Sequence, residues 1–123
     1  MTSITRYYNK KGQIIDEEPN RGPYYYLDLL DCAGMHIRIY KEYAHSMIEL
    51  AEVSYDRLYV EGEKDYRFAK VYFRVGNYRE YFENKNNINL FIMIVKIQAA
   101  LSDLPKSLVD DYIKLIIENI IEE

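Results

Sequence analysis

The chain has 123 residues, of which 49% are hydrophobic and 29% are charged, with only five glycines and three prolines. This length suits one domain, and the composition excludes a disordered, collagen-like or low-complexity chain. The formal net charge of −4 disfavours unassisted binding to phosphate backbones or anionic lipid. We therefore expect a single domain over residues 1–123.

The chain has one cysteine, Cys32, and cannot form an intramolecular disulfide. No cleavable signal pattern follows Met1, and the main apolar run, 90–101, is interrupted by Lys96 and Gln98. That run is shorter than the roughly 20 residues a membrane span needs. We expect a cytoplasmic protein with no membrane segment.

Tyrosine and isoleucine are distributed unevenly along the chain. Thirteen of the 14 tyrosines precede Phe82, whereas nine of the 15 isoleucines lie from Ile88 onward. Coding rich in A and T explains the abundance of both residues and predicts an origin in a low-GC bacterium or its phages and mobile elements, but it does not explain the partition. We therefore expect a Tyr-rich working surface over 1–82 and an Ile-rich helical scaffold over 83–123.

The first 40 residues predict strands. Two β-prone runs, 3–8 and 13–15, flank a polar turn that ends at Gly12, which is typical of a hairpin. A loop with two prolines follows over 16–23. Residues 35–40 alternate between apolar and polar and predict a strand. Residues 24–31 fit either the other strand of a second hairpin or a short helix.

The middle of the chain shows helical spacing. From Lys41 apolar residues recur every three or four positions, which predicts a helix that Gly62 ends. A second helix is predicted over 65–75, with a strand as the alternative because of its Tyr, Phe and Val content. A capping box beginning at Asn77 predicts a third helix. The residue pattern of 68–83 resembles that of one tetratricopeptide helical hairpin. The chain has no second copy of the pattern, so we interpret it as a local helix-turn-helix signature.

The C-terminal part predicts two helices, over 88–101 and 105–121. The first is apolar on nearly every side and is expected at the centre of the core. The second has an apolar stripe wider than a surface helix needs, so it either lies between two layers or meets another chain. The candidates for such a contact, in a possible homodimer, are Tyr112, Ile116 and Ile120.

The fold prediction is therefore a small α+β domain, with one or two N-terminal β-hairpins followed by a helical C-terminal half. A mostly α fold is the alternative.

No motif points to catalysis. The five glycines stand singly, far from any phosphate-binding loop pattern. The chain has only three soft metal ligands, Cys32, His36 and His45, which are too few for a zinc site without a carboxylate. A small enzyme that uses Cys32 or His36 is the third functional hypothesis, after the two given below. We predict a chain that is not an enzyme, with no catalytic residue, metal or cofactor.

The leading hypothesis is a protein-binding module, of the inhibitor or immunity type, that occludes a partner protein. Adjacent residues point to different sides of a strand or helix, so at least one ring of the Tyr cluster faces outward. Tyrosine is enriched at protein interfaces because it supplies a large contact area at low entropic cost. The interface candidates are Tyr24, Tyr25, Tyr26, Tyr40 and Tyr43.

The alternative hypothesis is a nucleic-acid-binding accessory or regulator. Four basic residues are spaced three, three and four apart, which places them on one side of the predicted helix, among aromatic residues. They are Lys64, Arg67, Lys70 and Arg74. The acidic net charge makes this the less favoured partner.

Overall fold

In the computed structural model, seven strands form one antiparallel sheet with the order β2-β1-β3-β4-β5-β6-β7. The structure describes residues 3–20, 22–31, 34–59, 66–82 and 88–121. From β3 onward each strand pairs with the next one in the chain, so the sheet is a meander with β2 and β7 at its edges. The strands are β1 (Ser3–Asn9), β2 (Ile14–Ile15), β3 (Tyr24–Asp31), β4 (Gly34–Tyr43), β5 (Ser46–Tyr59), β6 (Tyr66–Val75) and β7 (Tyr78–Phe82).

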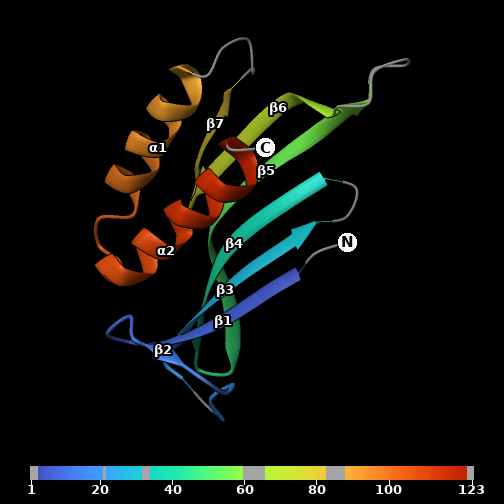
Figure 1. The fold of residues 1–123 in the computed structure, drawn as a ribbon. Coiled ribbons are helices and arrows are strands. Elements are labelled where there is room, and N and C mark those ends of the chain that lie inside the picture. The colour runs from blue at the N-terminus through green and yellow to red at the C-terminus, as the bar shows by residue number, and fades with distance from the viewer. Residues whose placement is uncertain (1–2, 21, 32–33, 60–65, 83–87, 122–123) are drawn as a thin grey trace.

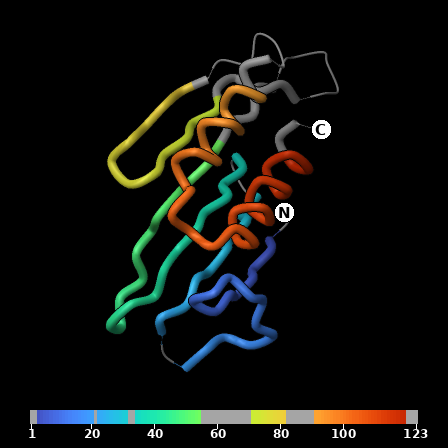
Figure 2. Tube along the Cα trace, turned by 90° about the vertical axis from the view of Figure 1, so that its left-hand side faces the viewer, coloured from blue at the N-terminus to red at the C-terminus, as the bar shows by residue number. Residues whose placement is uncertain are grey.

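Two helices, α1 (Ile88–Ala100) and α2 (Lys106–Ile116), lie on the same face of this sheet (Figure 1). The chain continues from α2 into a π-helical turn, Ile117–Ile121. In the view turned by 90°, the helices lie in front of the strands (Figure 2), so the helices form one layer and the sheet a second. The core lies between these layers and combines alternate strand residues with one side of each helix.

Three hydrogen bonds join the α2 region to distant strands and turns. The Tyr112 hydroxyl donates to the Ile37 carbonyl oxygen at 2.8 Å inside the core. The Tyr8 hydroxyl donates to Asp111 Oδ2 at 2.7 Å, and the Ser107 hydroxyl to the Gly12 carbonyl oxygen at 2.6 Å. These bonds satisfy buried polar groups and fix where α2 crosses the sheet.

Gly12, in the β1–β2 turn, makes the closest approach to α2. Its φ of +87° lies in the region that favours glycine. A Cβ at this position would lie 2.5 Å from both Pro105 Cβ and Ser107 Oγ. The turn therefore needs glycine for its conformation and for the space it leaves to the start of α2.

The α+β class and both N-terminal hairpins are confirmed. Tyr7 pairs with Ile15 in the first hairpin, and Tyr26 pairs with Tyr40 in the second, so 24–31 is a strand. The two C-terminal helices also form where they are predicted, apart from the π-helical end of the second.

The prediction of a helix from Lys41 is wrong, because the described residues form the end of β4 and then β5, and the predicted third helix is β7. For 66–75 the strand alternative is confirmed, because these residues form β6. The helical half therefore begins only at Ile88, and the helix-turn-helix signature over 68–83 is the β6–β7 hairpin. A bulge at Leu50, where Ile39 pairs with Ala51 but Tyr40 with Glu49, adds one residue to β5. The extra residue makes the spacing between Ile48 and Ala51 three instead of two, which imitates helical periodicity.

The prediction that 88–101 is buried at the centre of the core is also wrong. One side of α1 packs on the sheet through Met93 and Ile97, but Phe91 and Val95 on its other side are 63% and 64% exposed. The helix is apolar all round although only one of its sides is covered.

We predict that Tyr112→Phe lowers the free energy of unfolding by about 1–2 kcal/mol, because it leaves the buried Ile37 carbonyl without this donor. Urea denaturation measures the change. Tyr43→Phe is the matched control, since Tyr43 is 61% exposed, and its midpoint should equal that of the parent chain. Equal midpoints for the two variants would contradict the role given to the Tyr112 hydroxyl.

Candidate functional site

The candidate site is the open face of the sheet, the side away from α1 and α2 (Figures 1 and 2). Side chains alternate along a strand, so the neighbours of the core residues Leu27, Ile37 and Phe73 point to this side. The half-buried side chains that the structure describes here include Tyr7, Tyr26, Asp28, His36, Arg38, Tyr40, Glu49, Glu52, Tyr72 and Arg74.

Three tyrosines from three adjacent strands form a tyrosine row across the open face. Tyr7, Tyr26 and Tyr40 are in register on β1, β3 and β4. The ring centroids of Tyr7 and Tyr26 lie 5.1 Å apart, and those of Tyr26 and Tyr40 lie 5.6 Å apart. Such tilted aromatic contacts hold each ring against the next and stabilise the strand pairing.

The hydroxyls of Tyr7 and Tyr40 stay protonated at neutral pH. Burial raises the pKa of Tyr7, and the nearby charge of Glu18 adds to the effect. Burial also raises the pKa of Tyr40, where Arg38 opposes it and Glu49 adds to it. Tyr7 and Tyr40 therefore present neutral hydroxyls as hydrogen-bond donors and acceptors.

Beside the tyrosine row, four strands contribute a charged row. Asp28, Arg38, Glu52 and Arg74 are in register on β3, β4, β5 and β6, so the sign of the charge alternates across the sheet. Opposite charges directly across strands stabilise a sheet, so Arg38, Glu52 and Arg74 favour the pairing of β4, β5 and β6.

Glu49 joins the charged row and completes an ion network. Arg38 Nε lies 3.0 Å from Glu52 Oε2 and 3.3 Å from Glu49 Oε1. Arg74 Nη2 lies 2.5 Å from Glu49 Oε2, and Arg74 Nη1 donates to the Gly76 carbonyl oxygen at 2.9 Å. Both guanidinium groups are thus engaged within the chain.

The bulge at Leu50 is what brings the two glutamates together. Residues three apart point to opposite faces of a regular strand, so Glu49 and Glu52 would be separated by the sheet. The extra residue reverses the alternation, and Tyr40 pairs with Glu49 while Arg38 pairs with Glu52 on the same face. The network depends on this irregularity of β5.

The two carboxyls of the network differ in proton affinity. Burial raises the pKa of Glu49, and its hydrogen bond with Glu52 adds to this effect. Burial also acts on Glu52, but its hydrogen bonds with Glu49 and Arg38 outweigh it and lower the pKa of Glu52. Chemically, the pair accepts its first proton on Glu49 while Glu52 stays ionised against Arg38.

Among the predicted interface tyrosines, the structure brings together Tyr26 and Tyr40. The ring of Tyr24 contacts the ring of Tyr7, with their centroids 6.0 Å apart, but Tyr24 is buried. Tyr25 points into the core, where Lys41 Nζ lies 5.8 Å from the centre of its ring. Tyr43 is exposed near the β4–β5 turn, on the side opposite the tyrosine row.

The predicted basic face does not exist as a helix face, because residues 66–75 are strand β6. Lys64 lies outside the described residues, as do the side chains of Arg67 and Lys70. Arg74 is on the open face and is paired with Glu49. The four residues were grouped because helical spacing would place them on one side of a helix, and that argument does not apply to a strand.

Two of the three predicted dimer contacts are buried within the chain instead. Tyr112 and Ile116 are fully buried between α2 and the sheet, and the side chain of Ile120 lies outside the described residues. The wide apolar stripe of the last helix is explained by this intramolecular packing.

The soft ligands do not form a site in the described part of the chain. His36 Nδ1 lies 3.6 Å from Glu52 Oε1, and His45 is exposed in the β4–β5 turn with a φ of +66°. Cys32 lies outside the described residues. No group of three or more His, Cys, Asp or Glu that could hold a metal occurs within the ranges the structure describes.

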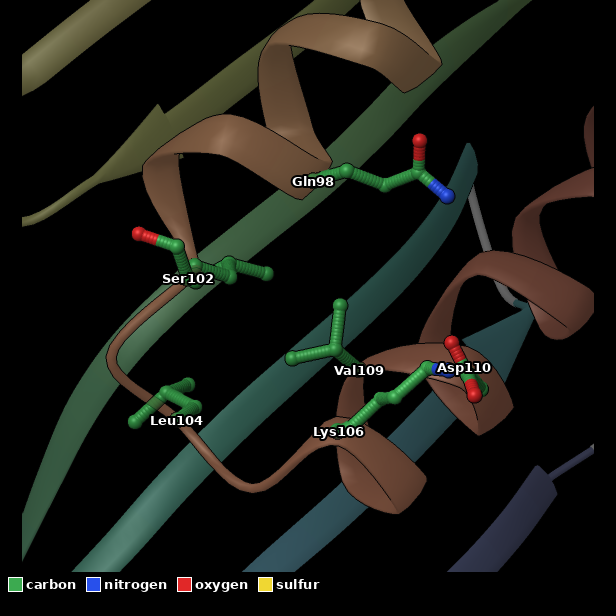
Figure 3. A pocket seen from close by; sticks show the side chains of 7 residues that line it. Gln98, Ser102, Leu104, Lys106, Val109 and Asp110 are labelled. Atoms are coloured by element: carbon green, nitrogen blue, oxygen red, sulfur yellow. The ribbon is translucent and has the colours of Figure 1, made fainter.

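One cavity of about 210 Å³ lies between the end of α1 and the start of α2 (Figure 3). Leu101 and Val109 are buried in its wall, while Lys106 and Asp110 extend beside each other at its rim (Figure 3). Its lining has no histidine or cysteine and presents no pair of groups that suits general acid–base or nucleophilic chemistry.

Sequence reasoning missed Tyr7, Asp28, Glu49 and Glu52 as site residues. Alternation along 24–31, with Tyr26, Asp28 and Leu30 opposite Tyr25, Leu27 and Leu29, was the available signal for Asp28. Nothing in the spacing of Glu49 and Glu52 indicated a bulge.

Comparison with known proteins gives no match: no family model, no curated protein and no solved structure is similar to this chain. Among the described residues, no helix has both the length and the apolar composition that a membrane span requires.

We predict that Arg38→Gln lowers the free energy of unfolding by about 1–2 kcal/mol at pH 7, since it leaves Glu52 without its cation in a partly screened site. Arg38 lowers the pKa of Glu52, so its stabilisation is present at neutral pH and is lost as the pH falls through that pKa. The difference in the free energy of unfolding between Arg38→Gln and the parent chain should therefore disappear at acidic pH. Denaturation at several pH values measures this difference.

Arg79→Gln is the control for this prediction. Arg79 is exposed on β7 and forms no ion pair in the described part of the chain, so its removal should change stability little. If the free energy of unfolding of Arg38→Gln differs from that of the parent by the same amount at neutral and acidic pH, the stabilising role given to the ion network is contradicted.

Proposed function

We propose that this chain is a non-enzymatic protein-binding module whose open sheet face covers a partner protein, as an inhibitor or immunity-type protein does. The observation that carries the proposal is the tyrosine row, which lies uncovered at the centre of a face that neither helix packs against. Aromatic residues surrounded by paired charges are the usual composition of an interface centre and its rim.

The row is pre-organised for this role. Its rings are fixed by their neighbours at 5.1 and 5.6 Å, and the ion network holds the adjoining strands. A surface whose side chains are already ordered loses little conformational entropy on binding. Because strands and not loops carry these residues, the partner meets a broad and rigid surface.

Nucleic-acid binding is the second candidate, and one observation favours it. A row of aromatic rings on an open antiparallel sheet can stack bases. Against it, Arg38 and Arg74 on the same face are both held by glutamates, so they are not free to meet phosphates. The protein-binding function therefore accounts for more of the surface.

We predict that Tyr26→Ala and Tyr40→Ala each weaken partner binding at least about tenfold, because interface tyrosines at the centre of a contact contribute strongly. The tagged chain is isolated from its native cells, a stoichiometric protein is identified, and its Kd is measured with each purified variant. Tyr43→Ala, an exposed tyrosine on the other side of the sheet, is the matched control and should change the Kd less than about twofold.

Unchanged binding by both row variants would contradict the proposal. Salt-sensitive retention of the parent chain on single-stranded nucleic acid, lost in the same two variants, would favour the second candidate instead.

A further inference from the structure

Asp28 is a half-buried carboxylate that the fold does not pair. It lies on β3 between Tyr26 and Leu30 on the open face, directly across from Arg38 on β4. Arg38 turns its guanidinium to the other side, toward Glu49 and Glu52. Within the part of the chain that the structure describes, Asp28 therefore makes no direct hydrogen bond or ion pair.

This arrangement costs stability. Burial raises the pKa of Asp28, and the more distant charges of Arg38 and His36 offset the rise only in part. A carboxylate that is partly removed from water without a direct partner favours its neutral form. Folding alone gives no reason to keep an acid here, whereas a partner that supplies the missing cation does.

The surroundings of Asp28 suit a planar cation. Tyr26 is its neighbour on the same face of β3, and the Tyr40 ring lies 5.6 Å from that of Tyr26. A guanidinium group binds a carboxylate through two parallel hydrogen bonds and also stacks on aromatic faces. An ammonium group lacks the planar fork and the stacking surface.

We infer that Asp28, flanked by Tyr26 and Tyr40, receives an arginine side chain from a basic surface of the partner protein. The inference rests on the proposed function and deepens it, because it states the charge of the partner and the residue that anchors it. The negative charge of Asp28 matches a basic protein and repels the phosphates of a nucleic acid.

The first test needs only the purified chain. Asp28→Asn should raise Tm by about 2–4 °C at pH 7, and the difference from the parent should vanish as the pH falls through the raised pKa of Asp28, where the parent acid becomes neutral. Asp110→Asn, an exposed acid on α2, is the matched control and should leave Tm unchanged. A lower Tm for Asp28→Asn would overturn the inference, since it would make Asp28 a structural acid.

The second test uses guanidinium ion as the probe, below denaturing concentration, with methylammonium as the comparison. Guanidinium should shift the backbone NMR signals of residues 26, 28 and 40 in a saturable way, at least threefold more than methylammonium. Both sets of shifts should be lost in Asp28→Asn and kept in Asp110→Asn. Equal shifts in parent and Asp28→Asn would overturn the inference.

Binding to the identified partner separates this inference from the proposed function. Asp28→Asn should weaken the complex at least tenfold. If Asp28→Asn binds normally while Tyr26→Ala and Tyr40→Ala do not, the arginine site is wrong and the binding face stands. If all three variants bind normally, the proposed function itself fails.

Discussion

Two helices cover only one face of a seven-stranded sheet, and the rest of the structure follows from this unequal coverage. Side chains alternate along each strand, so every strand that supplies a core residue also places its neighbours on the uncovered side. Those neighbours are half-buried by each other and still meet water. Such positions suit side chains that pack on one another and can also contact water. Tyrosines in ring contact and oppositely charged pairs have both properties, and they occupy this face.

The bulge at Leu50 shows how a local irregularity in a strand organises the surface. Without it Glu49 would point to the helix side of the sheet, away from Arg38 and Arg74. With it, Glu49 reaches Arg74 while Glu52 reaches Arg38, and two arginines from different strands are neutralised by one segment of β5. The same residue shift explains why β5 has helix-like spacing in the sequence.

The sequence predicts the parts of the fold that local chemistry determines. Local chemistry allows one structure at three places, and each was predicted correctly. These are the hairpin turn at Gly12, the strand over 35–40 and the helix that begins after Pro105. The helix prediction from Lys41 failed because the apolar spacing there fits a helix, and only pairing with the neighbouring strands selects the sheet. For 66–75 the sequence left helix and strand open, and the same pairing selects the strand. For the same reason Tyr26 and Tyr40 could be named separately, but not the row they form with Tyr7.

The tyrosines on the two faces differ in what the fold requires of them. Tyr8 and Tyr112 are fully buried and their hydroxyls hold α2 to the sheet, so folding accounts for both. Tyr26 and Tyr40 pack only on their neighbours across strands, where other β-prone side chains would stabilise the pairing as well. The same contrast separates Glu52, which neutralises Arg38, from Asp28, which has no direct counter-ion in the described chain. Residues that folding does not need gather on one face, and on this ground we propose that face as the working surface.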